Sequence, residues 1–255
     1  MGTLSLVIIA YNEEARIGDC IRSVASLADE VMVVDSGSTD QTVSIASALG
    51  ATVLHRTFTT HIEQKNWAWL QSSGDYILSL DADEALSPEL HRSIETAKAQ
   101  GFPAFGFSMN RLNHLGERAI KGCGWYPDRK IRLWKRGAAQ WAGENPHDRI
   151  EMGRGTEQAL RVDQLQGDLL HYTYSDLKAA RMQALKFGRI GAQEAGSGFW
   201  GLNLVKCLVS PWARFVRNYL LRSGWKYGWD GFVICFWQSV EVGMKYGLGF
   251  VYSLS

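Results

Sequence analysis

Several features that would assign a sequence to a class at once are missing from this chain of 255 residues. Its four cysteines (Cys20, Cys123, Cys207 and Cys235) stand far apart, so the sequence indicates neither a disulfide framework nor a zinc site. The formal net charge of +1 gives no reason to expect a nucleic-acid partner. No Gly-x-Gly-x-x-Gly motif follows the first apolar strand, which argues against a dinucleotide-dependent oxidoreductase.

Long apolar runs are missing as well. No stretch reaches about 18 uninterrupted apolar residues, the length at which a helix becomes a candidate to span a bilayer. The chain enters an apolar strand directly after Met1-Gly2-Thr3, without a basic segment before it, so we expect no secretory signal. The scattered cysteines are typical of reduced core thiols, and we expect a cytosolic protein.

The first hundred residues alternate strand and helix signals, which predicts an α/β fold with a mostly parallel sheet and helical crossovers. The predicted strands are residues 4–10, 31–34, 51–54 and 76–80; the predicted helices are residues 13–27, a segment ending at Leu49, 63–71 and 88–99. From about 101 to 167 the pattern loosens into short strands and turns, including a strand at 130–134. From about Asp176 onwards it becomes helical.

Three carboxylates follow the fourth predicted strand directly, as Asp81-Ala82-Asp83-Glu84. Open α/β sheets bind ligands at the carboxyl ends of their strands, and unpaired carboxylates are costly to desolvate, so charge at this place suggests a ligand site. A Mg²⁺ or Mn²⁺ ion that holds a diphosphate would need one or two carboxylates there. The alternative is that these acids stabilise the start of the helix that Pro88 begins.

Polar segments also follow the first two predicted strands, as Ala10-Tyr11-Asn12-Glu13-Glu14 and Asp35-Ser36-Gly37-Ser38-Thr39-Asp40. Together with Asp-Ala-Asp, their order resembles that of the family 2 inverting glycosyltransferases of GT-A fold, over roughly residues 1–100. Gln64-Lys65-Asn66 matches a basic position of that family. The resemblance implies a nucleotide-sugar-binding fold, a UDP-sugar donor and a divalent cation, Mg²⁺ or Mn²⁺.

A narrower resemblance extends further along the chain. Asp-Ala-Asp-Glu, the segment from Tyr126 to Trp134 and the triplet Pro146-His147-Asp148 are similar to the branch of β-1,4-glucosyltransferases that adds glucose to the inner-core heptose of bacterial lipopolysaccharide. This implies UDP-glucose as the donor and a lipid-linked oligosaccharide as the acceptor. Open alternatives are a polyprenyl phosphate, capsule or protein acceptor, or a nucleotide-sugar-binding protein without turnover.

The resemblance also implies roles in donor binding. Asp35 would accept a hydrogen bond from the uracil imide, and Tyr11 and Glu13, after Ala10 at the strand end, would contact the base or ribose. Asp35 could instead cap the following helix. Lys65 would reach a phosphate, or lie on a solvated helix face. Arg129 and Arg132 are expected on opposite faces of their strand, and we prefer Arg132 for the diphosphate.

Metal and catalytic roles follow in the same way. Asp83 is expected as the direct metal ligand, with Asp81 on the sugar, the ribose or the metal, and His171 as a further ligand or as a core histidine. Inversion needs a base for the acceptor hydroxyl. The resemblance assigns that role to Asp148, with Glu144 next, although Asp148 also suits a turn. The aromatic candidates for sugar stacking, or for simple packing, are Trp67, Trp69, Trp125 and Trp141.

The last part of the chain combines aromatic and basic residues. The sequence has ten tryptophans, many of them late, and from Arg189 onwards seven basic side chains stand against three acidic ones. Such segments are typical of helices that lie in a membrane interface, although a docking helix or an oligomer contact would also fit. We therefore expect a catalytic domain at 1–170, with a nucleotide-sugar half (1–100) and an acceptor half (101–170). Residues 171–255 are expected to form an amphipathic helical extension on the inner face of the cell membrane.

Overall fold

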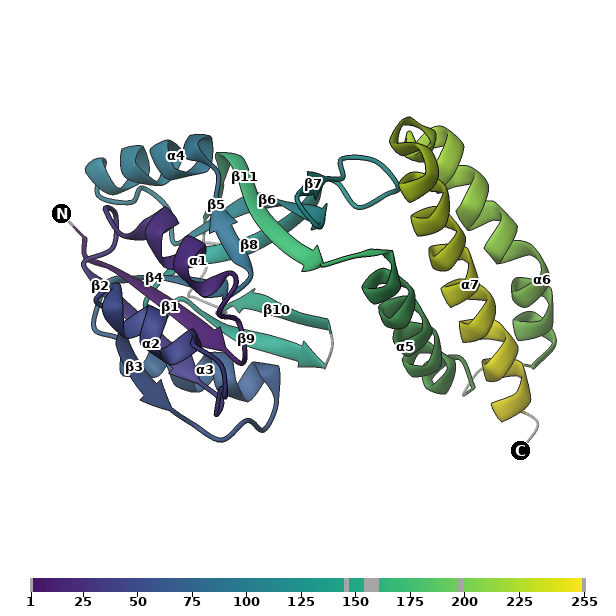
Figure 1. Ribbon diagram of the computed structural model, residues 1–255, viewed down its shortest axis with the longest axis horizontal. Helices are drawn as coiled ribbons and strands as arrows, with labels where there is room; N and C mark the ends of the chain where they lie inside the picture. Colours follow the sequence, from purple (N-terminus) through teal and green to yellow (C-terminus); the bar gives the residue numbers. More distant parts are fainter. Residues whose placement is uncertain (1, 145–146, 154–160, 197–199, 254–255) are drawn as a thin grey trace. The chain divides into compact units, whose positions relative to one another are not determined.

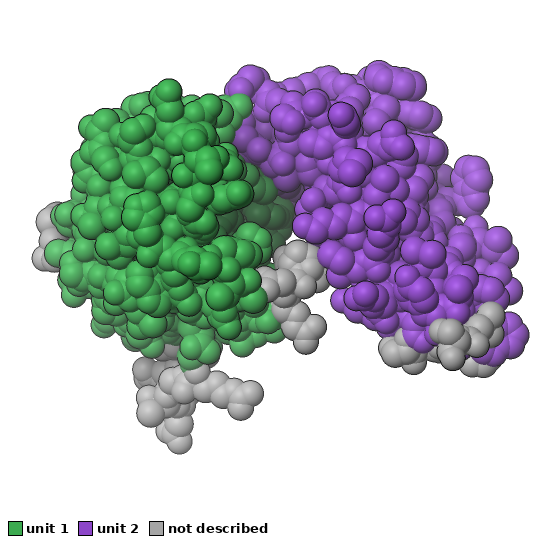
Figure 2. Space-filling view, turned by 60° about the horizontal axis from the view of Figure 1, so that its bottom comes forward, with its two compact units in different colours: residues 1–111, 128–171 green, residues 112–127, 172–255 purple. Residues whose placement is uncertain are grey.

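A computed structural model describes residues 2–144, 147–153, 161–196 and 200–253 (Figure 1). The side chains of Glu144 and His147 lie outside this description. The chain forms two compact units, coloured separately in Figure 2. Unit 1 comprises residues 1–111 and 128–171, and unit 2 comprises residues 112–127 and 172–255.

The main sheet begins as the sequence predicts and then changes direction. Its parallel half has the order β3 (Thr52–His55), β2 (Glu30–Asp35), β1 (Leu4–Ala10) and β4 (Tyr76–Asp81). The order continues through β8 (Asp128–Lys135), β6 (Gly106–Leu115), β11 (Val162–Tyr174) and β5 (Glu84–Leu86), with β7 (Arg118–Ala119) beside β6. The pairs β4–β8, β6–β8 and β5–β11 are antiparallel, so the sheet is mixed. A separate hairpin joins β9 (Ala139–Glu144) and β10 (His147–Met152).

Helices and apolar clusters cover both faces of the sheet. The helices of unit 1 are α1 (Ile17–Val24), α2 (Thr42–Ala48), α3 (His61–Gln71) and α4 (Pro88–Ala99). Because side chains alternate along a strand, Leu6 and Ile8 of β1 join the larger buried cluster with α1 and α4, whereas Val7 joins a second cluster that contains Trp134 and Trp141. This is a GT-A arrangement, and the α/β fold predicted from the sequence is confirmed.

Hydrogen-bonded caps set where two of these helices begin. Thr60 accepts a hydrogen bond from the backbone N–H of Glu63 at the start of α3. Ser87 accepts one from Leu90 at the start of α4, where Pro88 occupies the first turn. The start of α4 is therefore capped by Ser87, and Asp81 and Asp83 are not needed for it.

The register of the parallel strands aligns their carboxyl ends. Ala10 of β1 pairs with Asp35 of β2, and Ile9 pairs with Asp81 of β4. The three polar segments that the sequence places after these strands therefore leave the sheet at one edge, as predicted.

Unit 2 is built on three long helices, α5 (Leu177–Gly196), α6 (Trp200–Val216) and α7 (Gly228–Tyr252). A short π-helix, η1 (Arg217–Leu221), and a 3₁₀ turn, η2 (Gly224–Tyr227), connect α6 to α7. Small residues let α5 approach α7 closely: Ala180, Ala184, Gly188 and Ala192 form its buried stripe. Within the described residues, none of the helices has the length and apolar character needed to cross a bilayer.

Candidate active site

The loops after β1 and β2 are joined by hydrogen bonds. Asn12, in a left-handed conformation with φ of 53°, donates its backbone N–H to Ser38 Oγ at 2.9 Å. Its side-chain Oδ1 accepts from the Thr39 N–H at 2.8 Å, and the Glu13 N–H donates to Thr42 Oγ1 at 2.7 Å. These bonds hold the two polar segments together, so the edge of the sheet is held in place before any ligand binds.

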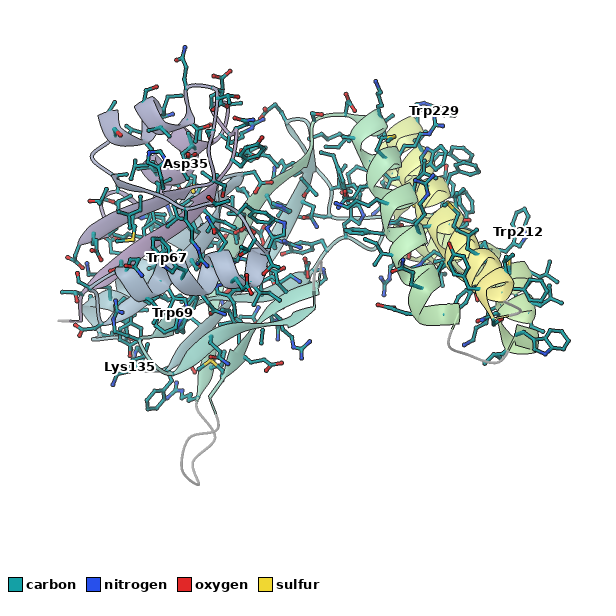
Figure 3. The ribbon with its side chains drawn as sticks, turned by 90° about the horizontal axis from the view of Figure 1, so that it is seen from below. Asp35, Trp67, Trp69, Lys135, Trp212 and Trp229 are labelled. Carbon is teal, nitrogen blue, oxygen red and sulfur yellow. The ribbon has the colours of Figure 1, made fainter. Side chains whose placement is uncertain are left out.

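Asp35 lies at this edge, almost completely buried (Figure 3). Its carboxylate accepts the backbone N–H groups of Gly37 at 2.9 Å and Ser38 at 3.1 Å, and His55 Nδ1 lies 3.3 Å from Oδ2. Asp35 therefore holds the turn that follows β2, and it does not cap the next helix, α2, which begins only at Thr42. Tyr11, by contrast, is exposed beyond the end of β1.

Asp81 lies between two cations. Its Oδ1 is 2.8 Å from Lys65 Nζ, and its Oδ2 is 3.3 Å from Arg132 Nη2. Burial raises the pKa of Asp81, but Lys65 and Arg132 outweigh burial and hold this pKa well below its usual range. Asp81 is therefore a permanent anion whose oxygens already have cationic partners. Arg129, in contrast, is exposed, so Arg132 is the arginine that reaches the cluster.

Glu84 anchors the same arginine from the other side. Its side chain is fully buried and receives Arg132 Nη2 at 2.7 Å and Nε at 3.1 Å, a two-point carboxylate–guanidinium contact. Glu84 also accepts the backbone N–H of Asp81 at 3.1 Å. Glu84 thus acts on Asp81 through its backbone and through Arg132, and it orients the carboxylate that follows β4.

Lys65 connects Asp81 to the β9–β10 hairpin. This lysine of α3 is only 4% exposed, and its Nζ lies 2.7 Å from Asp148 Oδ2 as well as 2.8 Å from Asp81. The fold thus brings together residues 65, 81 and 148, which lie on α3, β4 and β10. Lys65 is not on a solvated helix face, which was the alternative left open by the sequence.

A buried tryptophan supports both cations of this cluster. Lys65 Nζ lies 4.2 Å and the Arg132 guanidinium 5.0 Å from the ring centre of Trp141. Asn66 fixes the tryptophan backbone, since its amide donates to the Trp141 carbonyl at 2.8 Å and accepts the Trp141 N–H at 2.9 Å. Trp141 is too buried to stack on a sugar in this state, so it serves as a platform for cations.

Asp83 is placed with His171 rather than with Asp81. His171 Nε2 lies 3.3 Å from Asp83 Oδ2, and both side chains are partly accessible. Among the described residues, no group of three or more His, Cys, Asp or Glu side chains is arranged to hold a metal ion. A Mg²⁺ or Mn²⁺ ion that takes two protein ligands and completes its shell with phosphate oxygens and water does not need such a group. The pair Asp83 and His171 fits that kind of site.

Negative charge accumulates around Glu13. Burial, followed by the nearby charges of Asp83, Asp40 and Asp81, raises the pKa of Glu13 to about 7. Glu13 therefore takes up a proton more readily than an ordinary glutamate, because it is half-buried and faces other carboxylates, and a cation bound nearby would favour its charged form.

Two supporting residues were not found from the sequence. Asn66 was noted only as a neighbour of Lys65, and Trp141 only as one of several tryptophans. Their joint role depends on contact between α3 and β9, which no local motif signals. Of the other tryptophans, Trp67 lies beside Arg56 and Trp69 bonds to Asn66; Figure 3 labels both. Trp125 packs on Tyr174 in unit 2. The side chain of Glu144, the second candidate base, lies outside the described residues.

Comparison with known proteins identifies the family of this chain. The GT-A arrangement defines a nucleotide-sugar-binding class, and the profile of glycosyl transferase family 2 matches residues 5–158, so the protein belongs to that family. A glycosyltransferase of Rickettsia typhi described as uncharacterized is 31% identical over 91% of this chain and 82% of its own. The lipopolysaccharide core biosynthesis glycosyltransferase LpsC of Rhizobium meliloti is 27% identical over 90% and 85%, respectively. Among solved structures, glucosyl-3-phosphoglycerate synthase from Mycobacterium tuberculosis, in complex with Mn²⁺, UDP and glucosyl-3-phosphoglycerate, matches 44% of each chain at 28% identity, with a TM-score of 0.37.

Proposed function

We propose that this glycosyltransferase moves a hexose, glucose in the first instance, from a UDP-sugar to a lipopolysaccharide inner-core heptose with inversion at the anomeric carbon. The observation that carries the proposal is the single buried lysine that contacts both Asp81 at the sheet edge and Asp148 of the hairpin. The likeness to LpsC over 90% of the chain supports the acceptor class.

The donor would bind along the aligned strand ends. The base and ribose would meet Ala10, Tyr11, Glu13 and Asp35, the last of which would have to share its carboxylate with its own turn. Lys65 and Arg132 provide positive charge in a buried setting, where it acts on a diphosphate more strongly than in water. Asp81 would keep Lys65 and Arg132 oriented towards the diphosphate, or its carboxylate would release one of them and accept a hydrogen bond from a sugar hydroxyl.

Asp83 and His171 would hold a Mg²⁺ or Mn²⁺ ion, with Asp81 as a further ligand if Lys65 moves to the diphosphate. Such an ion neutralises the charge that develops on the departing UDP. The accumulated carboxylates around Glu13 favour the same cation.

Asp148 would take the proton of the acceptor hydroxyl as that oxygen attacks the anomeric carbon from the side opposite to the diphosphate. Its position supports this role, because Lys65 holds its carboxylate next to Asp81 rather than in a surface turn. Glu144 remains the second candidate for the base; it pairs across the hairpin with His147, the residue before Asp148.

A lipid-linked oligosaccharide acceptor would place the enzyme on the cytoplasmic face of the inner membrane. The competing acceptors are a polyprenyl phosphate, a capsule sugar and a protein, and the competing function is nucleotide-sugar binding without turnover. The same donor half would serve each of them, so only the acceptor reaction separates them.

A panel of UDP-sugars tests the donor and the metal together. We expect UDP-glucose with Mn²⁺ to raise the melting temperature, and the increase to disappear with chelator, because a ligand stabilises only the state that it binds. Asp83→Asn should lose the metal-dependent part of this increase, whereas Asp163→Asn, on β11 and paired with Arg161, should keep it. Transfer to an isolated inner-core acceptor should then release UDP. Stabilisation without any UDP release would favour the non-catalytic alternative, and equal stabilisation in chelator would contradict the metal assignment.

A further inference from the structure

Helix α6 exposes apolar side chains, which is unusual for a helix in contact with water. A helix on a protein surface normally turns a polar face outwards. Every described residue of α6 with an exposed side chain is apolar: Trp200, Leu202, Leu204, Val205, Leu208, Val209, Trp212, Ala213 and Val216. Trp212 is 74% exposed and Leu208 66% exposed, while the polar Asn203 is buried.

Helix α5 of the same unit behaves in the ordinary way and serves as an internal comparison. Its exposed side chains are Lys178, Arg181, Met182, Lys186, Arg189, Gln193 and Glu194. Both helices pack on α7, so their difference does not come from a lack of a packing partner. The apolar exposure is therefore a property of one face of unit 2.

This face continues beyond α6. Leu220 and Leu221 of η1 are exposed next along the chain. At the start of α7, Trp229 stacks on Phe232 and Phe232 stacks on Phe236, and all three rings are exposed. Figure 3 shows Trp212 and Trp229 pointing away from the helices that carry them. We call the exposed apolar residues of α6, η1 and the start of α7 the outer face. Exposed apolar areas of this extent mark binding surfaces.

Positive charge accompanies the outer face. Residues 200–252, which carry the outer face, contain six basic and two acidic side chains, and the basic residues Arg217, Arg222 and Lys226 are exposed. Arg214 lies in the last turn of α6, Arg217 begins η1, and Arg222 follows η1 directly. Burial lowers the pKa of Arg214, and repulsion from the nearby Arg217 lowers it further, against the attraction of Glu241 on α7. An anionic partner would relieve that repulsion.

We propose that the outer face binds an anionic lipid bilayer, with α6 lying in the plane of the interface and its leucine, valine and tryptophan side chains among the acyl chains. The exposed basic side chains that follow α6, Arg217, Arg222 and Lys226, then contact lipid phosphates. A second copy of the chain is a poorer partner, since it would bring the same excess of positive charge. The proposal deepens the proposed function, because it rests on the lipid-linked acceptor for its biological purpose.

Flotation with vesicles of phosphatidylglycerol and phosphatidylcholine tests the proposal on the full chain. We expect the double variant Leu208→Gln/Trp212→Gln to bind these vesicles about tenfold or more weakly, because two large apolar groups leave the acyl region. Met182→Gln is the matched control: Met182 is 59% exposed, but on the polar helix α5, and its loss should leave binding unchanged. Arg217→Gln should weaken binding about fivefold, in line with one charge near an anionic surface, and only with anionic vesicles.

Three outcomes would overturn the proposal. One is equal vesicle binding by the double variant and the wild type. Another is equal loss in Met182→Gln, which would indicate general damage. The third is a wild-type dimer in sedimentation without lipid that the double variant converts to monomer, which would assign the outer face to a second copy. UDP-glucose-dependent stabilisation, measured without vesicles, should be the same in all variants, so failure of lipid binding is distinguishable from failure of the donor assignment.

Discussion

The two units depart from the usual distribution of residues in opposite ways. Unit 1 buries charge: Glu84, Lys65 and Arg132 are almost inaccessible. Unit 2 exposes apolar surface: Trp212, Leu221 and Trp229 are among its most exposed side chains. Folded proteins normally avoid both arrangements, because buried charge is costly to desolvate and exposed apolar surface is costly to hydrate.

The difference between the two units indicates which kind of ligand each of them suits. Buried cations are prepared for a compact anion such as a diphosphate, which enters the site and replaces lost water. Exposed apolar side chains are prepared for an extended apolar partner that comes to the surface. In both units the unusual residues are held by tight local packing, Trp141 and Asn66 in one and α7 in the other, so neither arrangement results from a loosely built region.

Removing one member of the buried charge cluster in unit 1 should have the largest effect on stability, and it tests whether burial of charge distinguishes the two units. Arg132→Met leaves Glu84 buried without its two-point partner, and we expect a loss of about 3–5 kcal/mol in the free energy of unfolding, measured in urea. Arg129→Met, on the same strand but exposed, should change stability by less than about 0.5 kcal/mol.

The double variant Glu84→Leu/Arg132→Met sharpens the result. If the loss comes from a stranded charge, replacing both partners by apolar groups should restore much of the stability. A double variant as unstable as Arg132→Met would instead mean that packing at this position, and not the unpaired carboxylate, determines stability.

The proposed base gives the next effect. Asp148→Asn should lower kcat by about 10²–10⁴-fold, the usual contribution of general base catalysis, with little change in the affinity for the UDP-sugar. Glu151→Gln, three residues further along β10 and exposed, is the matched control and should keep its kcat. If donor affinity collapsed in Asp148→Asn, the residue would be structural, as one partner of Lys65.

Much of unit 1 could be predicted from the sequence, and the reasons are local. Runs such as residues 4–10 and 76–80 are apolar throughout, and strand ends followed by Asp35 and Asp81 predict the site edge without knowledge of the tertiary fold. The antiparallel half of the sheet, the Asn66–Trp141 link and the pairing of Asp83 with His171 depend on contacts across many residues. No periodicity in the sequence encodes such contacts.

Unit 2 was predictable in kind but not in orientation. The sequence predicts helices with apolar and basic residues, and periodicity alone gives each helix an apolar side. It does not say which of the helices turns its apolar side outwards, and in the structure α6 does so whereas α5 does not. Only the structure shows that Asn203 faces inwards and Trp212 outwards.

Two glycines of α5 test whether the inner packing of unit 2 is as close as that of an ordinary core. A Cβ on Gly188 would lie 3.0 Å from Met244 Cβ and 3.1 Å from the Glu241 carbonyl oxygen, whereas a Cβ on Gly191 would meet the flexible side chain of Lys245. We expect Gly188→Ala to be less stable than Gly191→Ala by about 1–2 kcal/mol in urea unfolding, since only the first crowds backbone. Equal stabilities would mean that α5 and α7 are loosely packed, and the apolar outer face could then reflect poor packing.

The smallest effect concerns Glu13, the half-buried carboxyl of unit 1 that like charges surround. Its pKa of about 7 lies above the ordinary 4.5, so between these values the native state binds more protons than the unfolded state, and stability falls as pH rises. Glu13→Gln removes this loss. In chelator at pH 8 we expect the variant to melt about 2–4 °C higher than wild type, roughly 1 kcal/mol after allowance for solvent screening, and near pH 4.5 the two should coincide. Glu95→Gln, exposed on α4, should show no such dependence on pH. A difference in melting temperature that is constant from pH 4.5 to pH 8 would rule out the ionisation of Glu13, which burial and then the neighbouring carboxylates oppose, as its cause.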